Sequence, residues 1–234
     1  MNNPISKRVW VTGASSGLGL ALVEHLLEKG ARVAASGRAC KTLQDLTLQY
    51  HPNLLLLDSN LTEQLEALEA AKQITDRWGA LDCLIINAGT CDYLAVDTPA
   101  PAIFESIVSS NLSASSYCLE SAVPLLQGGR SPQVAGILSR YSSLQLNEAS
   151  QLTTADNSLM QLFNNQRATL AAQAIDLTII APLNLKFPLI PEQIIPEQWT
   201  AQSAAEVILN RLPARSANLV LEALHLNNLW PLPK

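Results

Sequence analysis

The feature that most constrains the fold is a glycine-rich turn near the N-terminus. An apolar run at residues 9–11 leads into the sequence TGASSGLG at residues 12–19, and an amphipathic stretch follows to residue 29. This order predicts a strand, a tight turn and the start of a helix. Such a turn presents backbone N–H groups and the positive end of a helix dipole to a phosphate group. We therefore predict a phosphate-binding turn.

Composition and charge exclude several classes of function. A chain of 234 residues suits one α/β domain, and a net charge of −5 argues against nucleic acid as a main partner. We also expect no membrane span and no secretory signal peptide. The four cysteines are scattered, as is usual for reduced thiols in the cytoplasm, and no His or Cys spacing indicates a metal site.

Strand and helix patterns alternate along the whole chain. Short apolar runs predict strands at residues 9–12, 31–36, 54–57, 81–86, 134–138, 177–180 and 219–224. Helical spacing predicts helices at residues 18–29, 43–50, 62–78, 103–126, 157–174 and 201–212, with Thr62 as an N-cap. Repeated βα units predict a single-domain, doubly wound parallel sheet, a Rossmann fold over residues 1–234 with helices on both faces.

The spacing of the glycines, with Thr12 before them, resembles the short-chain dehydrogenase/reductase family. Further landmarks follow in the family's order, namely an Asn-Ala-Gly tripeptide at residues 87–89, Asp58 after the third strand, Asn111 on the long central helix, and Pro182 after the sixth strand. The resemblance implies that these residues surround a dinucleotide. The predicted cofactor-binding residues are Gly13, Ser15, Ser16, Gly17, Leu18, Gly19, Arg38, Asp58, Asn87, Ala88, Gly89 and Pro182.

Charge at the end of the second strand predicts which dinucleotide is bound. Folds that select NAD usually place an acidic residue there, where it accepts hydrogen bonds from the ribose hydroxyls. This chain has the sequence ASGR at residues 35–38, with Arg38 and no acid. A guanidinium pairs well with a 2′-phosphate, so we predict NADP(H), with Arg38 and Ser15 on that phosphate.

The proton-transfer residues that the resemblance implies are missing. The family uses a serine after the fifth strand and a Tyr-x-x-x-Lys pair on the next helix. The family alignment puts Ser142 at the serine, or Ser143 with a one-residue slip, but Ala155 at the tyrosine and Leu159 at the lysine. No tyrosine in this chain is followed four residues later by lysine. Leu183 and Phe187 replace two further residues of the nicotinamide end.

The candidate catalytic residues are therefore Ser142, Asn111 and Tyr141. Tyr93, Asp92 and Asp156 are other acids or bases that a remodelled site could use. Three functions remain compatible with the sequence. They are a pseudo-oxidoreductase subunit, an enzyme of non-standard chemistry acting on a small molecule, and a regulatory sensor of NADP(H).

The resemblance also implies an oligomer, either of identical chains or with a related active subunit. The family commonly pairs its two central helices between subunits, which correspond here to residues 103–126 and 157–174. Apolar side chains predicted to serve that interface are Leu159, Leu162, Phe163 and Leu170.

Overall fold

The computed structural model describes residues 6–87, 103–138, 159–182 and 200–221. Its strands are β1 (Arg8–Thr12), β2 (Arg32–Ser36), β3 (Leu54–Leu57), β4 (Cys83–Asn87), β5 (Gln133–Ile137), β6 (Asp176–Pro182) and β7 (Asn218–Leu221). Its helices are α1 (Gly17–Glu28), α2 (Lys41–Tyr50), α3 (Gln64–Trp78), α4 (Ile103–Gln127), α6 (Leu159–Ala172) and α7 (Ala201–Arg211), followed by the short 3₁₀ helix η3 (Leu212–Ala214). Strands and helices thus alternate, as predicted.

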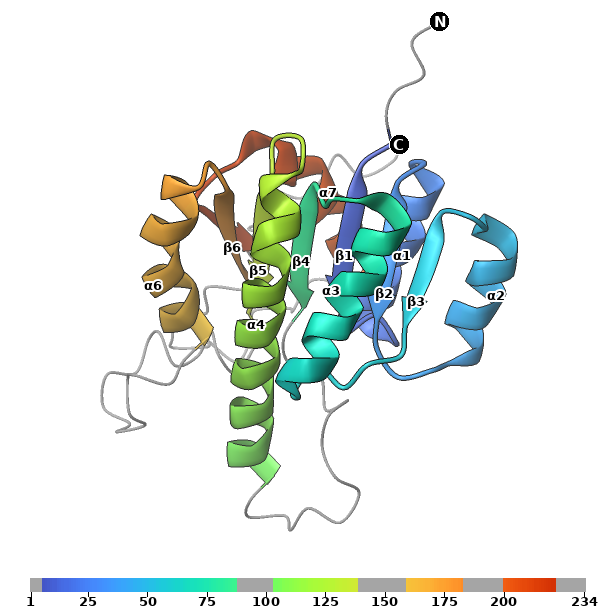
Figure 1. Ribbon diagram of the computed structural model, residues 1–234, viewed down its shortest axis with the longest axis horizontal. Coiled ribbons are helices and arrows are strands. Elements are labelled where there is room, and N and C mark those ends of the chain that lie inside the picture. Colours follow the sequence, from blue (N-terminus) through green and yellow to red (C-terminus); the bar gives the residue numbers. More distant parts are fainter. Residues whose placement is uncertain (1–5, 88–102, 139–158, 183–199, 222–234) are drawn as a thin grey trace, which may run out of the picture.

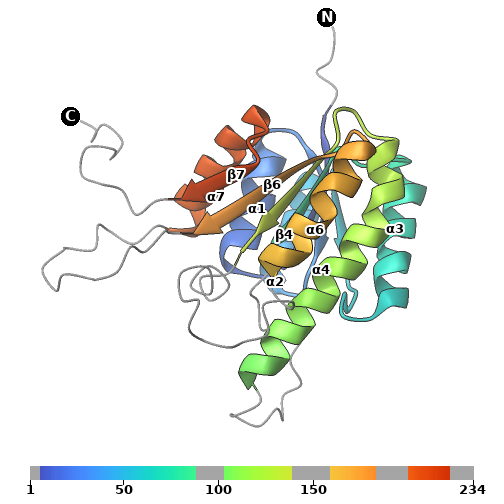
Figure 2. The same ribbon diagram turned by 90° about the vertical axis from the view of Figure 1, so that its left-hand side faces the viewer.

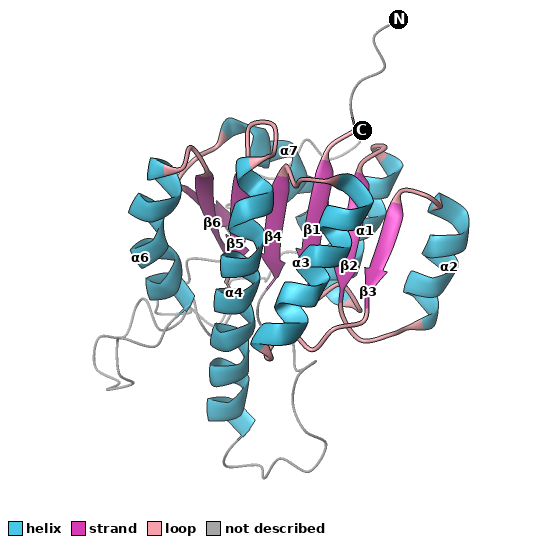
Figure 3. Cartoon of the chain, in the orientation of Figure 1, coloured by secondary structure: helices cyan, strands magenta, loops and turns pink. Residues whose placement is uncertain are grey.

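The strands form one parallel sheet in the order β3-β2-β1-β4-β5-β6-β7 (Figure 1 and Figure 3). The chain runs outward from β1 to β3, then returns to pair β4 with the other side of β1. A parallel sheet needs a crossover between successive strands, and helices supply those crossovers. The fold is therefore the predicted doubly wound Rossmann type.

Helices cover both faces of the sheet (Figure 2). One apolar cluster joins α3, α4 and α6 to side chains such as Trp10 and Leu84, and a second joins α1, α2 and α7 to side chains such as Val11 and Ile85. Neighbouring strand residues alternate between the clusters because successive side chains of a strand point to opposite faces. Both faces being buried explains why the strands read as continuous apolar runs.

Two expectations from the sequence need correction. Thr62 does not cap α3, because that helix begins at Gln64 and Glu63 occupies the N-cap position; the Thr62 N–H and hydroxyl instead donate to Asn60. Of the four α6 side chains predicted to serve an interface, Leu159, Phe163 and Leu170 are instead buried in this chain's own core, and Leu162 is partly buried against it. The three buried side chains are therefore not available for contact with another subunit.

A partly buried ion pair between Arg8 and Asp82 stabilises the edge where the strands begin. The Asp82 carboxylate accepts hydrogen bonds from Arg8 at Nη2 (2.7 Å), Nε (3.0 Å) and the backbone N–H (2.8 Å), and from the Arg130 backbone N–H (2.8 Å). Burial by itself raises the pKa of Asp82, but the bonds from Arg8 and Arg130 outweigh it and hold that pKa below its usual value. This cluster is structural and lies at the opposite edge from the glycine turn.

Candidate dinucleotide site

The carboxyl ends of the strands bring the predicted site residues to one edge of the sheet. Thr12 pairs with Ser36 in the strand register, and Asn87 pairs with Ile137. Between β1 and β4 the strand order reverses, so the crossovers on the two sides of this point lead away from each other. Ligands of open α/β sheets bind at such a switch point.

The glycine turn has the conformation that its sequence predicts. Gly13 and Gly17 have positive φ angles of 62° and 54°, a region that side chains with a Cβ rarely enter. A Cβ on Gly17 would meet no atom within 4 Å, so the space beside it is open. A Cβ on Gly19 would lie 2.0 Å from the carbonyl oxygen of Gly13, which requires a glycine there. The conformation of Gly13 and Gly17 and the close packing at Gly19 each explain why glycine occupies that position.

Asn87 holds the turn from the neighbouring strand. Its backbone N–H donates to the hydroxyl oxygen of Thr12 at 3.1 Å, and its side-chain Nδ2 donates to the carbonyl oxygen of Gly13 at 3.2 Å. Asn87 and Thr12 are both buried. The prediction placed Asn87 beside the cofactor, whereas these bonds show that it also fixes the turn itself.

The end of β2 holds the other side of the turn, through residues that the sequence analysis did not single out. The Ala14 N–H donates to the Ser36 carbonyl oxygen at 2.9 Å. A Cβ on Gly37 would lie 2.9 Å from the Ser15 nitrogen, so a glycine lets the two segments approach. The thiol of Cys40 donates to the Ser15 carbonyl oxygen at 3.5 Å. In the sequence, only the small size of Ser36 and Gly37 indicates that the end of β2 approaches the turn closely.

The first turn of α1 has features that favour binding of an anion. Ser16 stands at the N-cap, but its side chain makes no capping hydrogen bond. No acidic residue lies in that first turn. A helix N-terminus carries partial positive charge on its leading N–H groups, which a phosphate oxygen can accept. The turn residues therefore fit the pyrophosphate of a dinucleotide.

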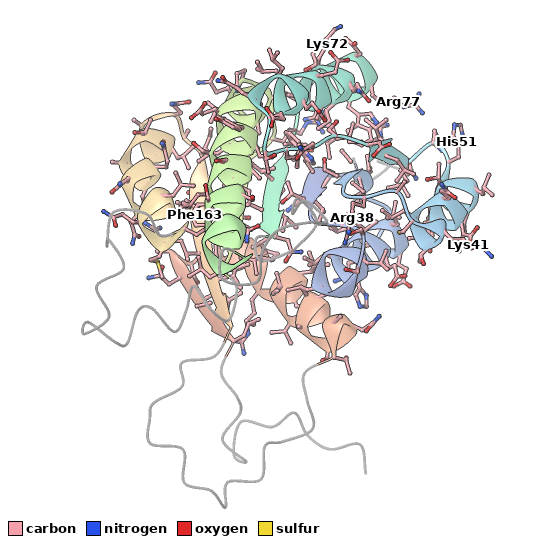
Figure 4. The ribbon with its side chains drawn as sticks, turned by 90° about the horizontal axis from the view of Figure 1, so that it is seen from below. Arg38, Lys41, His51, Lys72, Arg77 and Phe163 are labelled. Carbon is pink, nitrogen blue, oxygen red and sulfur yellow. The ribbon has the colours of Figure 1, made fainter. Side chains whose placement is uncertain are left out.

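Arg38 and Asp58 follow β2 and β3 at the same edge, and both are exposed. Figure 4 looks onto this edge and shows Arg38 near α1 and α2. Pro182 ends β6, paired with Leu221. Their contacts with a ligand remain predictions.

The residues predicted for the reacting end are only partly described. Asn111 is a buried residue of α4. Leu159, which the family alignment puts at the position of the lysine, is the first residue of α6 and packs in the same apolar cluster as Phe163. Figure 4 shows Phe163 between α6 and α4. The other predicted site residues lie outside the described residues; they are Ala88, Gly89, Asp92, Tyr93, Tyr141, Ser142, Ser143 and Asp156.

Comparisons with known proteins agree with this geometry. A model of the short chain dehydrogenase family matches residues 7–193. The chain belongs to this family. Its members typically bind NAD(P)(H), which agrees with the fit of the turn to a pyrophosphate.

A curated relative supports the same assignment over part of its length. The 3-phenylpropionate-dihydrodiol/cinnamic acid-dihydrodiol dehydrogenase of Escherichia coli is 38% identical over 105 residues. That stretch covers 44% of this chain and 39% of the relative, so the match spans about two fifths of the relative's length.

Two solved structures share the fold across almost the whole chain. A short-chain dehydrogenase from Streptomyces avermitilis superposes with a TM-score of 0.72 at 22% identity, covering 94% of this chain and 89% of that one. The NADP active-site complex of RhlG from Pseudomonas aeruginosa gives a TM-score of 0.70 at 20% identity, covering 94% and 96%.

The part of the chain that the structure describes contains neither a membrane-spanning helix nor a cluster of metal ligands. There, no helix combines the length and the apolar character needed to span a bilayer. No group of three or more His, Cys, Asp or Glu side chains is arranged to hold a metal ion in the same residues.

Proposed function

We propose that this short-chain dehydrogenase family member binds NADP(H) but lacks the family's proton-transfer pair. It works as a pseudo-oxidoreductase subunit, in an oligomer of identical chains or with a related active subunit. One contrast carries the proposal: the glycine turn is complete, whereas no tyrosine in the chain is followed four residues later by lysine. The unpaired thiols of Cys40, Cys83 and Cys118 are compatible with a cytoplasmic location, which the proposal includes.

The preference for NADP(H) follows from Arg38. It stands two residues after the end of β2, where an acid would repel a 2′-phosphate and a guanidinium attracts it. The structural likeness to a protein in complex with NADP supports this choice. When bound, the dinucleotide supplies a hydride donor or acceptor. The chain's own residues hold its pyrophosphate and its 2′-phosphate.

The loss of proton transfer follows from the chemistry of the missing groups. A phenol with a pKa near 10 needs an adjacent ammonium to act at neutral pH. Ala155 and Leu159 supply neither, and Leu159 is 4% exposed within an apolar cluster. Removing a general acid alone typically slows a reaction by about 10²–10⁴-fold. Hydride transfer is therefore expected to be below detection in this chain alone.

An activity assay tests the proposal directly. The purified chain is mixed with NADP⁺ and the dihydrodiol of 3-phenylpropionate, the substrate class named for the E. coli relative, and with NADPH and aromatic aldehydes. We expect cofactor binding without change in absorbance at 340 nm. Turnover that disappears in Ser142→Ala would contradict the proposal and favour the alternative of non-standard chemistry.

A pair of charge variants tests the cofactor preference. Arg38→Ala removes the cation expected at the 2′-phosphate, and a charged hydrogen bond of that kind corresponds to about ten- to a hundredfold in affinity. Lys41→Ala is the matched control, because Lys41 is an exposed cation three residues further on. We expect Arg38→Ala to weaken NADPH binding about tenfold or more and NADH binding less than twofold. Equal effects of the two variants would refute the preference.

The size of the assembly tests the partner. Light scattering on the purified chain separates a monomer from a homo-oligomer, and co-expression with a related intact dehydrogenase from the same source tests the mixed assembly. We expect an oligomer in one of these two experiments. A chain that stays monomeric in both would remove the oligomeric part of the proposal and leave cofactor binding unaffected.

A further inference from the structure

Trp10 and Ser36 connect the core of the sheet to the glycine turn. Trp10 is fully buried on β1, and its indole Nε1 donates to the Ser36 hydroxyl oxygen at 2.8 Å. Ser36 is also fully buried and is the last residue of β2. Its carbonyl oxygen accepts the Ala14 N–H of the turn at 2.9 Å. One residue therefore contacts the core with its side chain and the turn with its backbone.

The hydroxyl of Ser36 adds a side-chain contact at the strand end, where the backbone of Ser36 pairs with Thr12 on one side and with Leu57 on the other. Beyond Ser36 the ladder stops, and the chain continues through Gly37, which packs against the Ser15 nitrogen. A buried indole N–H needs an acceptor, because an unpaired buried donor loses its hydration without gaining a hydrogen bond in return. The pair Trp10–Ser36 thus satisfies the indole and fixes the residue whose carbonyl holds Ala14.

We propose that Ser36 is a positioning residue for dinucleotide binding, acting through Trp10 to hold the glycine turn in the conformation that receives the pyrophosphate. The inference deepens the proposed function and rests on it. Ser36 touches no ligand itself, since it is wholly buried beneath the turn. We expect its effect to be larger on the pyrophosphate, which the turn holds, than on the 2′-phosphate.

The test uses two ligands that differ in the pyrophosphate. NADPH spans the turn, whereas adenosine 2′-monophosphate carries the 2′-phosphate and adenine without a pyrophosphate. Each is titrated by calorimetry into wild-type chain, Ser36→Ala and Trp10→Phe, at a temperature well below every variant's Tm. Thr178→Val is the matched control, because the Thr178 hydroxyl is equally buried and accepts a bond of 3.0 Å from Gln133 on strands away from the turn.

We expect Ser36→Ala and Trp10→Phe each to raise the Kd of NADPH about tenfold, as for an unpaired buried donor or acceptor near the turn. The Kd of adenosine 2′-monophosphate should change less than twofold. Thr178→Val should lower Tm by a few degrees and leave both Kd values unchanged. A merely structural pair would affect Tm in all three variants but leave NADPH binding intact.

Two results would overturn the inference while leaving the proposed function in place. One is unchanged NADPH affinity in Ser36→Ala and Trp10→Phe. The other is an equal loss of both ligands, which would locate the effect at the adenosine end instead of the turn. A wild-type chain that binds neither ligand would contradict the proposed function itself, and the inference with it.

Discussion

Replacing Gly19 with alanine should disrupt the turn more than any other single-methyl change at this edge. The added Cβ would lie 2.0 Å from the carbonyl oxygen of Gly13 and 2.8 Å from Nδ2 of Asn87. A clash with backbone costs about 3 kcal/mol, and losing the Asn87–Gly13 hydrogen bond costs about 1 kcal/mol. Alanine regains about 1 kcal/mol of helix propensity. The free energy of unfolding should therefore fall by about 3 kcal/mol.

A second glycine provides the control. Gly79 ends α3 with a φ of 74°, and a Cβ there would meet no atom within 4 Å, so Gly79→Ala carries only the left-handed backbone penalty of about 1 kcal/mol. Thermal unfolding followed by circular dichroism should show a Tm lowered by about 6–12 °C for Gly19→Ala and by a third of that for Gly79→Ala. Gly19→Ala should also lose NADPH binding, and Gly79→Ala should keep it. Equal Tm changes, or retained NADPH binding in Gly19→Ala, would refute the reasoning.

The remaining predictions concern groups away from the turn. Pairing with Arg8 holds the pKa of Asp82 low in the folded state. The stabilisation from this pair is therefore complete above the unfolded-state pKa of about 3.9 and is lost as the pH falls through the folded-state pKa. Unfolding in urea between pH 5 and 3 should show a weaker pH dependence of stability in Asp82→Asn than in wild type. Thr200→Ala, which removes the bond that caps α7, should cost about 1 kcal/mol, and Ser16→Ala, which removes no capping bond, should change stability by less than about 0.5 kcal/mol in the same assay. Burial raises the pKa of Cys83 to about 12, so a maleimide should fail to label it in the native protein, and rapid labelling would contradict that environment.

The sequence predicted the elements of the fold because strands covered on both faces read as apolar runs. The strand predicted at residues 54–57 coincides with β3. The helix predicted at residues 201–212 corresponds to α7, and residue 212, the last of the predicted helix, begins η3. The N-cap of α3 was missed because Thr62 and Asn60 bond each other in the preceding turn instead of capping the helix. Short-range competition of this kind leaves no distinct pattern in the sequence.

The candidate site was predictable where one residue's conformation decided its identity. The backbone conformation of Gly13 and Gly17 and the close packing at Gly19 favour glycine, so a sequence motif identifies these positions. Ser36 and Trp10 gave no such signal, since their hydrogen bond joins residues 26 positions apart and depends on strand register. The buried face of α6 was assigned to a subunit interface because periodicity shows an apolar face without showing what covers it.

Calorimetric titration of the purified chain with NADPH, repeated with NADH, tests the central claim most directly. The claim predicts saturable binding of one NADPH per chain with a Kd below about 100 μM, and NADH binding at least about tenfold weaker. A titration that shows no saturable heat with NADPH up to about 1 mM, or tighter binding of NADH, would contradict it.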